Sequence, residues 1–157
     1  MKENKYIRFL VFLVANFLAL GIGSWLMNDG PNTDWYQSLN KAPWTPPGWV
    51  FGAAWTTIML LFAVYMTKVS FKYPYLSKKL LVLYGVQWIL NVSWNYLFFN
   101  QHLTTISLVV IILLWLLIGY FTFKHLKQVK NYTFFILPYL VWMTIATSLN
   151  LYVVLNN

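Results

Sequence analysis

The chain has 157 residues, of which 60% are hydrophobic, 20% aromatic and only 9% charged. A soluble domain carries about 25% charged residues to cover its surface, so this composition excludes an ordinary soluble globular protein. The net charge of +8 does not indicate nucleic-acid binding, because no basic cluster is interleaved with aromatic residues on a soluble surface.

Charged residues and histidines leave five long uncharged stretches, at 9–28, 42–67, 80–101, 103–123 and 131–157. A membrane-spanning helix needs about 20 predominantly apolar residues. The sequence therefore predicts an all-α membrane protein, a bundle of five transmembrane helices in one domain covering 1–157. The predicted spans are 7–27, 48–67, 80–99, 104–123 and 133–155.

Basic residues gather on one side of the predicted membrane. Ten of the eleven lysines and arginines lie before or at the start of the first span, or in the second and fourth connections: Lys2, Lys5, Arg8, Lys68, Lys72, Lys78, Lys79, Lys124, Lys127 and Lys130. Only Lys41 lies on the other side, together with Asp29 and Asp34. The positive-inside rule then predicts a cytosolic N-terminus and a C-terminus on the opposite side.

The first span, 7–27, carries small residues at four-residue spacing, namely Ala15, Ala19 and Gly23. Such a stripe lets two helices approach closely, either within the bundle or between the protomers of a homodimer.

The connection 28–47 leads into an aromatic segment. Four of the nine tryptophans and three of the six prolines lie between residues 35 and 55. Prolines stiffen a chain without forming helix or sheet, and large rings are normally buried or lie at a membrane interface. We expect a lid over an apolar binding site, or a re-entrant loop that only seals helix ends.

The third and fifth spans carry polar stripes. Gln87, Asn91 and Asn95 share one face of span 80–99, and Trp142, Ala146 and Asn150 share one face of span 133–155. Amides are costly in hydrocarbon unless they are paired, so both stripes should face the bundle interior. They predict either interhelical hydrogen bonds or an aromatic pocket with a few polar contacts. The nearly featureless span 104–123 is the one expected to face lipid.

Acid–base and metal chemistry find little support. No Asp or Glu lies inside a predicted span, so a proton relay has no carboxylate. His102 and His125 are predicted on opposite sides of the membrane, which excludes a joint metal site within one chain. The absence of cysteine excludes disulfides, thiolate metal sites and cysteine nucleophiles. We therefore predict no metal site and no required cofactor.

Several motifs together resemble the translocator protein family, also called tryptophan-rich sensory proteins or peripheral-type benzodiazepine receptors. The motifs are Trp35-Tyr36-x-x-Leu39-x-Lys41 followed by Trp44-x-Pro46-Pro47 and Trp55, Asn91-x-x-Trp94 with Phe98-Phe99, and Pro138-Tyr139-x-x-Trp142-x-x-x-Ala146-Thr147-x-x-Asn150. The resemblance covers nearly the whole chain. It implies a five-helix bundle, commonly a homodimer, in the cell membrane of a bacterium.

The family resemblance also implies ligands, which are porphyrins, haem, synthetic benzodiazepine-site drugs and, for animal members, cholesterol. The implied binding residues are Tyr36, Pro46, Phe51, Trp55, Asn91, Trp94, Trp142, Ala146 and Leu149. Trp55 and Trp142 match family tryptophans proposed to support light-dependent porphyrin breakdown. Two positions depart from the family pattern: Ala42 separates Lys41 from the following proline, and no basic residue follows Tyr152, which argues against cholesterol.

Three functional classes follow from these observations. The first is a membrane binding or sensor protein that holds a porphyrin in an aromatic pocket and promotes its light- and oxygen-dependent degradation, the only enzymatic activity that the residues support. The alternative is a transporter of tetrapyrroles or sterols, although no internal repeat is visible. The third is a purely structural membrane partner that dimerises through the small-residue stripe.

Overall fold

The computed structural model describes residues 4–73 and 77–157 and consists of helices and their connections. Lys2, Glu3 and Pro74 lie outside the described residues. The long helices are α1 (Lys5–Leu26), α3 (Gly48–Ser70), α4 (Lys78–Asn95), α5 (Thr104–Val129) and α6 (Leu137–Asn156). Shorter elements are η1 (Gly30–Asn32), α2 (Asp34–Ser38), the π-helix η2 (Tyr96–Asn100) and η3 (Lys130–Phe135).

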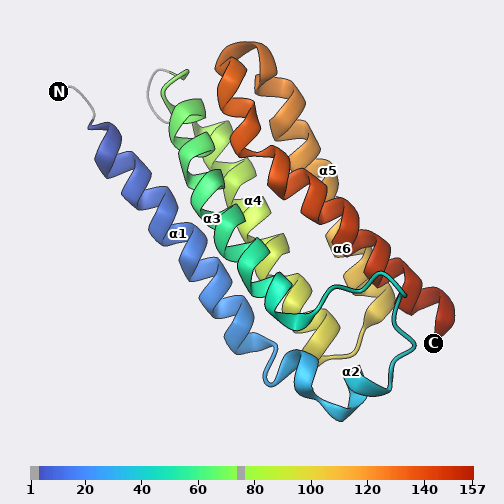
Figure 1. The fold of residues 1–157 in the computed structure, drawn as a ribbon. Coiled ribbons are helices and arrows are strands. Elements are labelled where there is room, and N and C mark those ends of the chain that lie inside the picture. Colours follow the sequence, from blue (N-terminus) through green and yellow to red (C-terminus); the bar gives the residue numbers. More distant parts are fainter. Residues whose placement is uncertain (1–3, 74–76) are drawn as a thin grey trace.

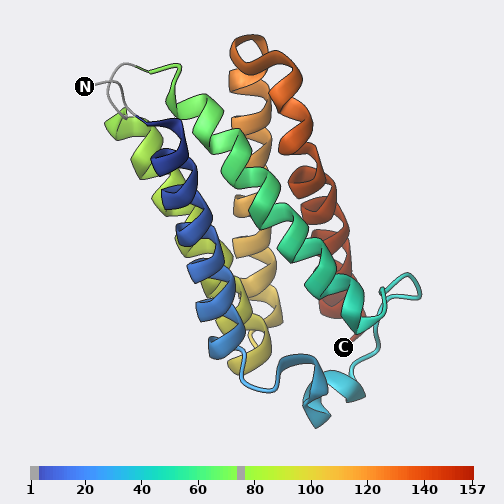
Figure 2. The same cartoon turned by 60° about the vertical axis from the view of Figure 1, so that its left-hand side comes forward.

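The five long helices form the predicted bundle (Figures 1 and 2). Helix α1 packs against α3 and α4, α4 also packs against α5, and α5 packs against α6. The connections α3–α4 and α5–α6 lie at the end of the bundle where the chain begins, whereas α2 and the C-terminus lie at the other end (Figure 1). The predicted basic connections therefore share one end of the molecule, which we call the basic end.

Four of the described helices are long and apolar enough to cross a membrane: α1, α3, α5 and α6. Helix α4 is more polar, but its amides Gln87 and Asn91 are buried while Leu81, Val82 and Ile89 are exposed. Its outer surface is thus apolar, as a helix in contact with lipid requires. The chain is a multi-pass integral membrane protein.

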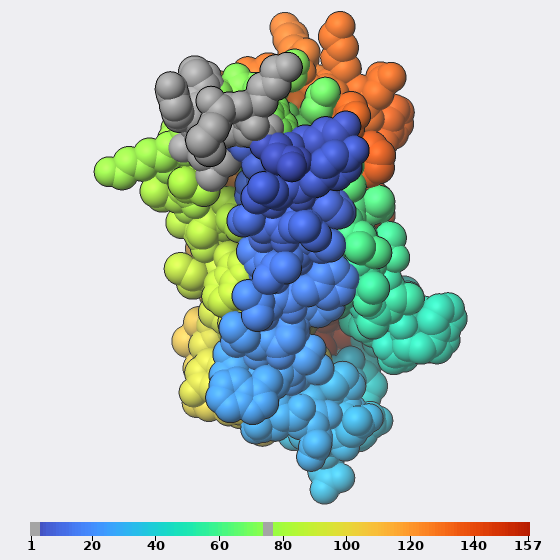
Figure 3. All heavy atoms as spheres, turned by 90° about the vertical axis from the view of Figure 1, so that its left-hand side faces the viewer, coloured from blue at the N-terminus to red at the C-terminus, as the bar shows by residue number. Residues whose placement is uncertain are grey.

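The helix most exposed to lipid is α1, which differs from the prediction, although α5 also exposes apolar side chains. Span 104–123 was expected to be the most lipid-exposed, but α5 packs against both α4 and α6 and buries Ile111, Leu114 and Ile118. In the most apolar stretch of α1 only 22% of residues are buried, against 33% in α5. Helix α1 lies across one face of the bundle (Figure 3), so one of its own sides is exposed. Uniform hydrophobicity therefore did not identify the helix with the largest exposed share.

Buried hydrogen bonds join the helices through two amides of the predicted α4 stripe, Gln87 and Asn91, whereas the third, Asn95, donates among the described residues only to the Asn91 carbonyl oxygen of its own helix. Tyr139 Oη accepts from Gln87 Nε2 at 2.7 Å and from Asn91 Nδ2 at 2.8 Å, which links α4 to α6. Asn16 Nδ2 donates to the Met59 carbonyl oxygen at 2.9 Å. Tyr84 Oη donates to Asn16 Oδ1 at 2.6 Å. Asn16 therefore connects α1, α3 and α4, although its single amide in an apolar span drew no prediction.

The small-residue stripe packs within the bundle. Ala19 and Gly23 are buried against neighbouring helices, and the Trp88 indole donates to the Ala15 carbonyl oxygen at 2.8 Å. A Cβ placed on Gly23 would lie 2.8 Å from Nδ2 of Asn95. The suggestion that this stripe forms a dimer interface is therefore wrong, because the α1–α4 contact already covers it.

We expect Gly23→Leu to lower the free energy of unfolding by about 2 kcal/mol, because the larger side chain displaces the Asn95 side chain and overpacks the α1–α4 contact. Gly21→Leu is the matched control, since nothing lies within 4 Å of a Cβ at Gly21. Both variants would be unfolded with dodecyl sulfate in mixed micelles and followed by circular dichroism. Equal effects of the two substitutions would contradict a close α1–α4 contact.

Candidate functional site

The first half of the 28–47 loop contains a short helix, contrary to the expectation of a segment without helix. The Thr33 hydroxyl caps α2 by accepting from the Tyr36 backbone N–H at 3.3 Å. The Trp35 ring stacks on His102 with centroids 3.9 Å apart and meets the edge of Phe98 at 5.6 Å. These ring contacts attach α2 to the turn between α4 and α5.

The second half of the same loop is attached to α6. Trp44 Nε1 donates to Ser148 Oγ at 3.1 Å, and the Trp44 ring meets Tyr152 edge-on at 5.5 Å. The inserted Ala42 is buried, and its carbonyl oxygen accepts from both N and Oγ1 of Thr45 at 2.9 and 2.7 Å. The extra residue thus forms the corner of a turn. The two halves attach to different helices, so the loop extends across the space between them.

The end of α4 widens into the π-helix η2, which brings two phenylalanines beneath the loop. Phe98 is buried, stacks on Trp94 with centroids 5.4 Å apart and meets Phe99 edge-on at 4.9 Å. The Tyr36 ring contacts both phenylalanines, with its centroid 6.4 Å from that of Phe98 and 5.4 Å from that of Phe99. One extra residue in a turn re-aims the side chains that follow, and such turns often lie at functional sites.

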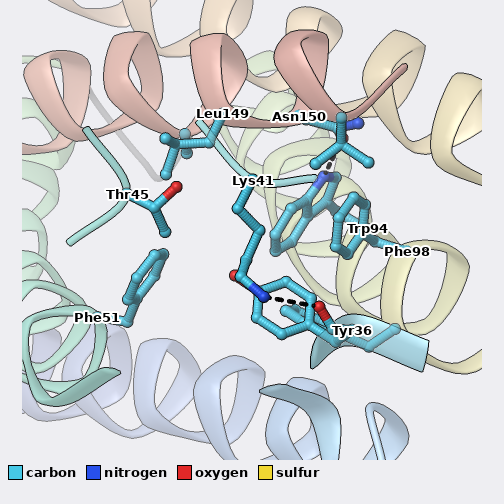
Figure 4. A pocket seen from close by; sticks show the side chains of 11 residues that line it. Tyr36, Lys41, Thr45, Phe51, Trp94, Phe98, Leu149 and Asn150 are labelled. Atoms are coloured by element: carbon cyan, nitrogen blue, oxygen red, sulfur yellow. Dashed lines mark hydrogen bonds between the residues drawn. The ribbon is translucent and has the colours of Figure 1, made fainter. Parts of the chain in front are cut away.

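A cavity lies beneath this loop, between α2, α3, α4, η2 and α6 (Figure 4). Its wall consists mainly of rings and aliphatic side chains with one lysine: Tyr36, Lys41, Thr45, Phe51, Trp94, Phe98, Phe99, Ala146, Leu149, Asn150 and Val153. Its volume is about 40 Å³. On that scale one water needs about 10–15 Å³, so the cavity holds only a few water molecules in this state.

Lys41 provides the ammonium group of the cavity wall, and its side chain extends across the cavity towards Tyr36 (Figure 4). Its Nζ donates to the carbonyl oxygens of Tyr36 and Gln37 at 3.0 and 3.2 Å and lies 4.9 Å from the centre of the Tyr36 ring. Burial raises the pKa of the Tyr36 phenol, which therefore stays neutral at physiological pH. The wall thus combines a fixed positive charge with neutral aromatic faces.

Asn150 holds the aromatic wall in place. Its Oδ1 accepts from Trp94 Nε1 at 3.0 Å and from Ser107 Oγ at 3.1 Å, while its Nδ2 donates to the Thr104 carbonyl oxygen at 3.0 Å. The side chain is 1% exposed. One amide of the predicted α6 stripe therefore joins α4, α5 and α6 at the edge of the cavity.

The structure brings five of the nine predicted binding residues into the cavity wall, namely Tyr36, Phe51, Trp94, Ala146 and Leu149. The other four lie outside it. Trp142 meets Phe51 edge-on at 5.4 Å, and Trp55 meets Tyr139 edge-on at 5.8 Å. Asn91 binds Tyr139, and Pro46 lies in the loop beside Thr45. The binding role of all nine, and the catalytic role of Trp55 and Trp142, stay predictions.

Six wall residues were not among the predicted binding residues: Lys41, Thr45, Phe98, Phe99, Asn150 and Val153. Four of them stand inside the motifs that carried the family resemblance, so the motif itself was the signal. Thr45 and Val153 carried no such signal: Thr45 reaches the wall through the loop turn at Ala42, and Val153 through its place on the buried face of α6.

Comparison with known proteins agrees with this architecture. Residues 11–155 match the model of the TspO/MBR family. The chain is 33% identical over 144 residues to the tryptophan-rich sensory protein of Cereibacter sphaeroides, covering 90% of this chain and 86% of that protein. It is 28% identical over 142 residues to the translocator protein of Homo sapiens, covering 88% and 83% of the two chains. The chain therefore belongs to the TspO/MBR family.

Proposed function

We propose that this protein binds flat aromatic ligands of the porphyrin class in the cavity beneath the 28–47 loop and acts as a membrane sensor for them. The observation that carries the proposal is the composition of the cavity wall, which combines several aromatic faces with one lysine. A macrocycle can stack on the faces of Trp94, Phe98 and Tyr36. A propionate of the same ligand can pair with the Lys41 ammonium.

Binding requires the cavity to open, because about 40 Å³ cannot hold a macrocycle. The Lys41 side chain occupies the centre of the space, where its ammonium binds two backbone carbonyl oxygens. A ligand carboxylate offers a charged partner in place of those neutral ones, and charge-assisted hydrogen bonds are the stronger kind. We infer that ligand entry withdraws Lys41 from Tyr36 and lifts the loop.

The proposal includes oxidative breakdown of the bound porphyrin, driven by light and dioxygen. An excited porphyrin converts dioxygen into a reactive species, and a nearby indole donates an electron or traps the product. Trp142 Nε1 is buried without a hydrogen-bond partner in the described chain, and Phe51 lies between this ring and the cavity. A buried indole N–H without a partner supports the choice of Trp142, because a ligand that displaces Phe51 would reach it.

Because of the family resemblance, we also propose that the protein binds benzodiazepine-site drugs and forms a homodimer. The exposed apolar face of α1, which includes Leu10, Val14 and Leu18, is a surface that lipid or a second copy can cover. Transport of tetrapyrroles or sterols is the alternative. Saturable porphyrin uptake into vesicles that Trp55→Ala abolishes would favour it.

Lys41→Met is expected to weaken protoporphyrin binding by about 2 kcal/mol, the typical contribution of a hydrogen bond to a charged group. The dimethyl ester of protoporphyrin has no carboxylate and should bind the wild type and the variant equally. Saturable quenching of tryptophan fluorescence in detergent measures both affinities.

Lys68→Met, which removes a lysine outside the cavity wall, is the control for net charge. Unsaturable quenching by both ligands in the wild type, unchanged in Tyr36→Ala, would contradict the proposed binding site. Equal losses for the acid and the ester in Lys41→Met would contradict pairing of Lys41 with a carboxylate.

A further inference from the structure

A second cavity lies at the basic end of the bundle, far from the site described above. It is formed by Tyr73, Ser77 and the first turns of α4 on one side and by the end of α5 on the other. Its volume is about 160 Å³, which is larger than that of the cavity beneath the 28–47 loop. The start of α4 and the end of α5, which supply most of its wall, both lie at the basic end (Figure 2).

Two lysines, Lys79 of α4 and Lys124 of α5, line this cavity from opposite sides. Both are exposed, and no ion pair joins either of them to a described residue. Asp29 and Asp34, the acids within 4–73 and 77–157, both lie in the 28–47 loop at the other end of the bundle. The two ammonium groups thus line one cavity with no neutralising carboxylate among residues 4–73 and 77–157, so the cavity favours an anion.

The floor of the cavity is a histidine whose ring nitrogens are both occupied. His125 is buried; Nδ1 lies 3.0 Å from the Phe121 carbonyl oxygen and Nε2 lies 3.0 Å from Tyr73 Oη. A carbonyl oxygen only accepts, so Nδ1 carries the proton and donates. Nε2 of the neutral ring then accepts from the tyrosine. His125 therefore positions Tyr73 at the cavity edge. It has no free N–H for an anion, so the two lysines are the groups that would bind one.

The start of α4 adds to the positive field. The helix begins at Lys78, and its N-cap residue Ser77, which lines the cavity, makes no side-chain capping bond. The N–H groups of a first helical turn carry partial positive charge and favour anions. The lysines and the helix start thus act in the same direction.

The same cavity has an apolar side. Leu80 and Leu83 belong to its wall, and Val82 and Val86 are exposed on the adjoining surface of α4. An anion that also carries hydrocarbon chains matches both parts. Basic pockets between transmembrane helices on the cytosolic side are suited to acidic lipid headgroups, and the positive-inside rule assigns this end of the bundle to that side.

We propose that the cavity between α4 and α5 binds the phosphate of an acidic phospholipid between Lys79 and Lys124, with its acyl chains along the outer surface of α4. This site is separate from the proposed porphyrin site and does not depend on it. Binding at the basic end would make the interaction of the protein with the membrane depend on the content of acidic phospholipid.

Native mass spectrometry of the full chain released from detergent, titrated with phosphatidylglycerol or phosphatidylcholine, tests the proposal. The wild type should bind one phosphatidylglycerol saturably and in preference to phosphatidylcholine. Lys79→Gln combined with Lys124→Gln should weaken phosphatidylglycerol binding about 30-fold, the effect expected for two lysines at a membrane surface. Lys72→Gln combined with Lys127→Gln removes the same charge from exposed positions outside the cavity wall and should change binding less than about threefold.

Three results would overturn the proposal. Equal weakening by the two double variants would mean that only the overall charge attracts the lipid. Equal affinity for the two phospholipids would exclude recognition of the acidic headgroup. Displacement of the lipid by millimolar inorganic phosphate, lost in Lys79→Gln/Lys124→Gln, would assign the cavity to a soluble phosphate. Unchanged helicity by circular dichroism confirms that each variant is folded.

Discussion

Asn150→Ala is expected to lower the free energy of unfolding by about 3 kcal/mol. The substitution leaves the Trp94 indole N–H without its partner in a buried environment and creates a small cavity beside Ser107. Because Asn150 connects three helices, the loss should also loosen the aromatic wall of the proposed porphyrin site. Unfolding in dodecyl sulfate measures the free energy of unfolding. The protoporphyrin titration measures the affinity, which should fall if the aromatic wall loosens.

Asn95→Ala is the matched control for this substitution. The Asn95 amide donates only to the Asn91 carbonyl oxygen of its own helix, at 3.4 Å, and makes no bond to another described helix. Its replacement should change stability by less than about 0.5 kcal/mol. Equal destabilisation by the two alanines would show that Asn150 is not the central interhelical contact.

Illumination of the porphyrin complex in air is expected to yield one discrete product in the wild type, which Trp55→Phe and Trp142→Phe both lose at matched porphyrin occupancy. A phenyl ring keeps the packing against Tyr139 and Phe51 but is a far poorer electron donor than an indole. Product analysis by liquid chromatography and mass spectrometry measures the outcome.

Trp115→Phe is the control for the number of tryptophans, because Trp115 lies on the outer side of α5 and binds Thr144. If the porphyrin bleached at the same rate in all four proteins and gave a mixture of products, catalysis would be contradicted. Only the proposal of porphyrin binding would then remain. That result would leave the Lys41 prediction unaffected, since the titration is carried out in the dark.

The helices were predictable from the spacing of charged residues, because each uncharged stretch had the length of a membrane-spanning helix. Their ends were less predictable. The predicted span 104–123 ends before Lys124, yet α5 continues to Val129. The helix can continue because lysines at its end extend their ammonium groups into the polar interface. Span 133–155 began too early, because Pro138 lies in the first turn of α6 and η3 precedes it.

The candidate site was predictable only where a motif named it. The ring of Tyr36 and the indole of Trp94 belong to motifs, and both line the cavity. The helix α2 was missed, since five residues are too few to show a helical period. The small volume of the cavity could not be predicted either, because the position of the Lys41 side chain depends on its bonds to the carbonyl oxygens of Tyr36 and Gln37.

The two cavities are separated by a closed layer of the bundle. Along α4 the basic-end cavity reaches Leu83 and the aromatic cavity begins at Trp94, roughly 16 Å apart on a helical rise. Between them Gln87 and Asn91 are buried and bound to Tyr139. We expect this layer to act as a permeation barrier, since a molecule that passes between α4 and α6 would have to break both bonds. Any ligand that this fold moves across a membrane is therefore expected to travel along the lipid-facing grooves between helices.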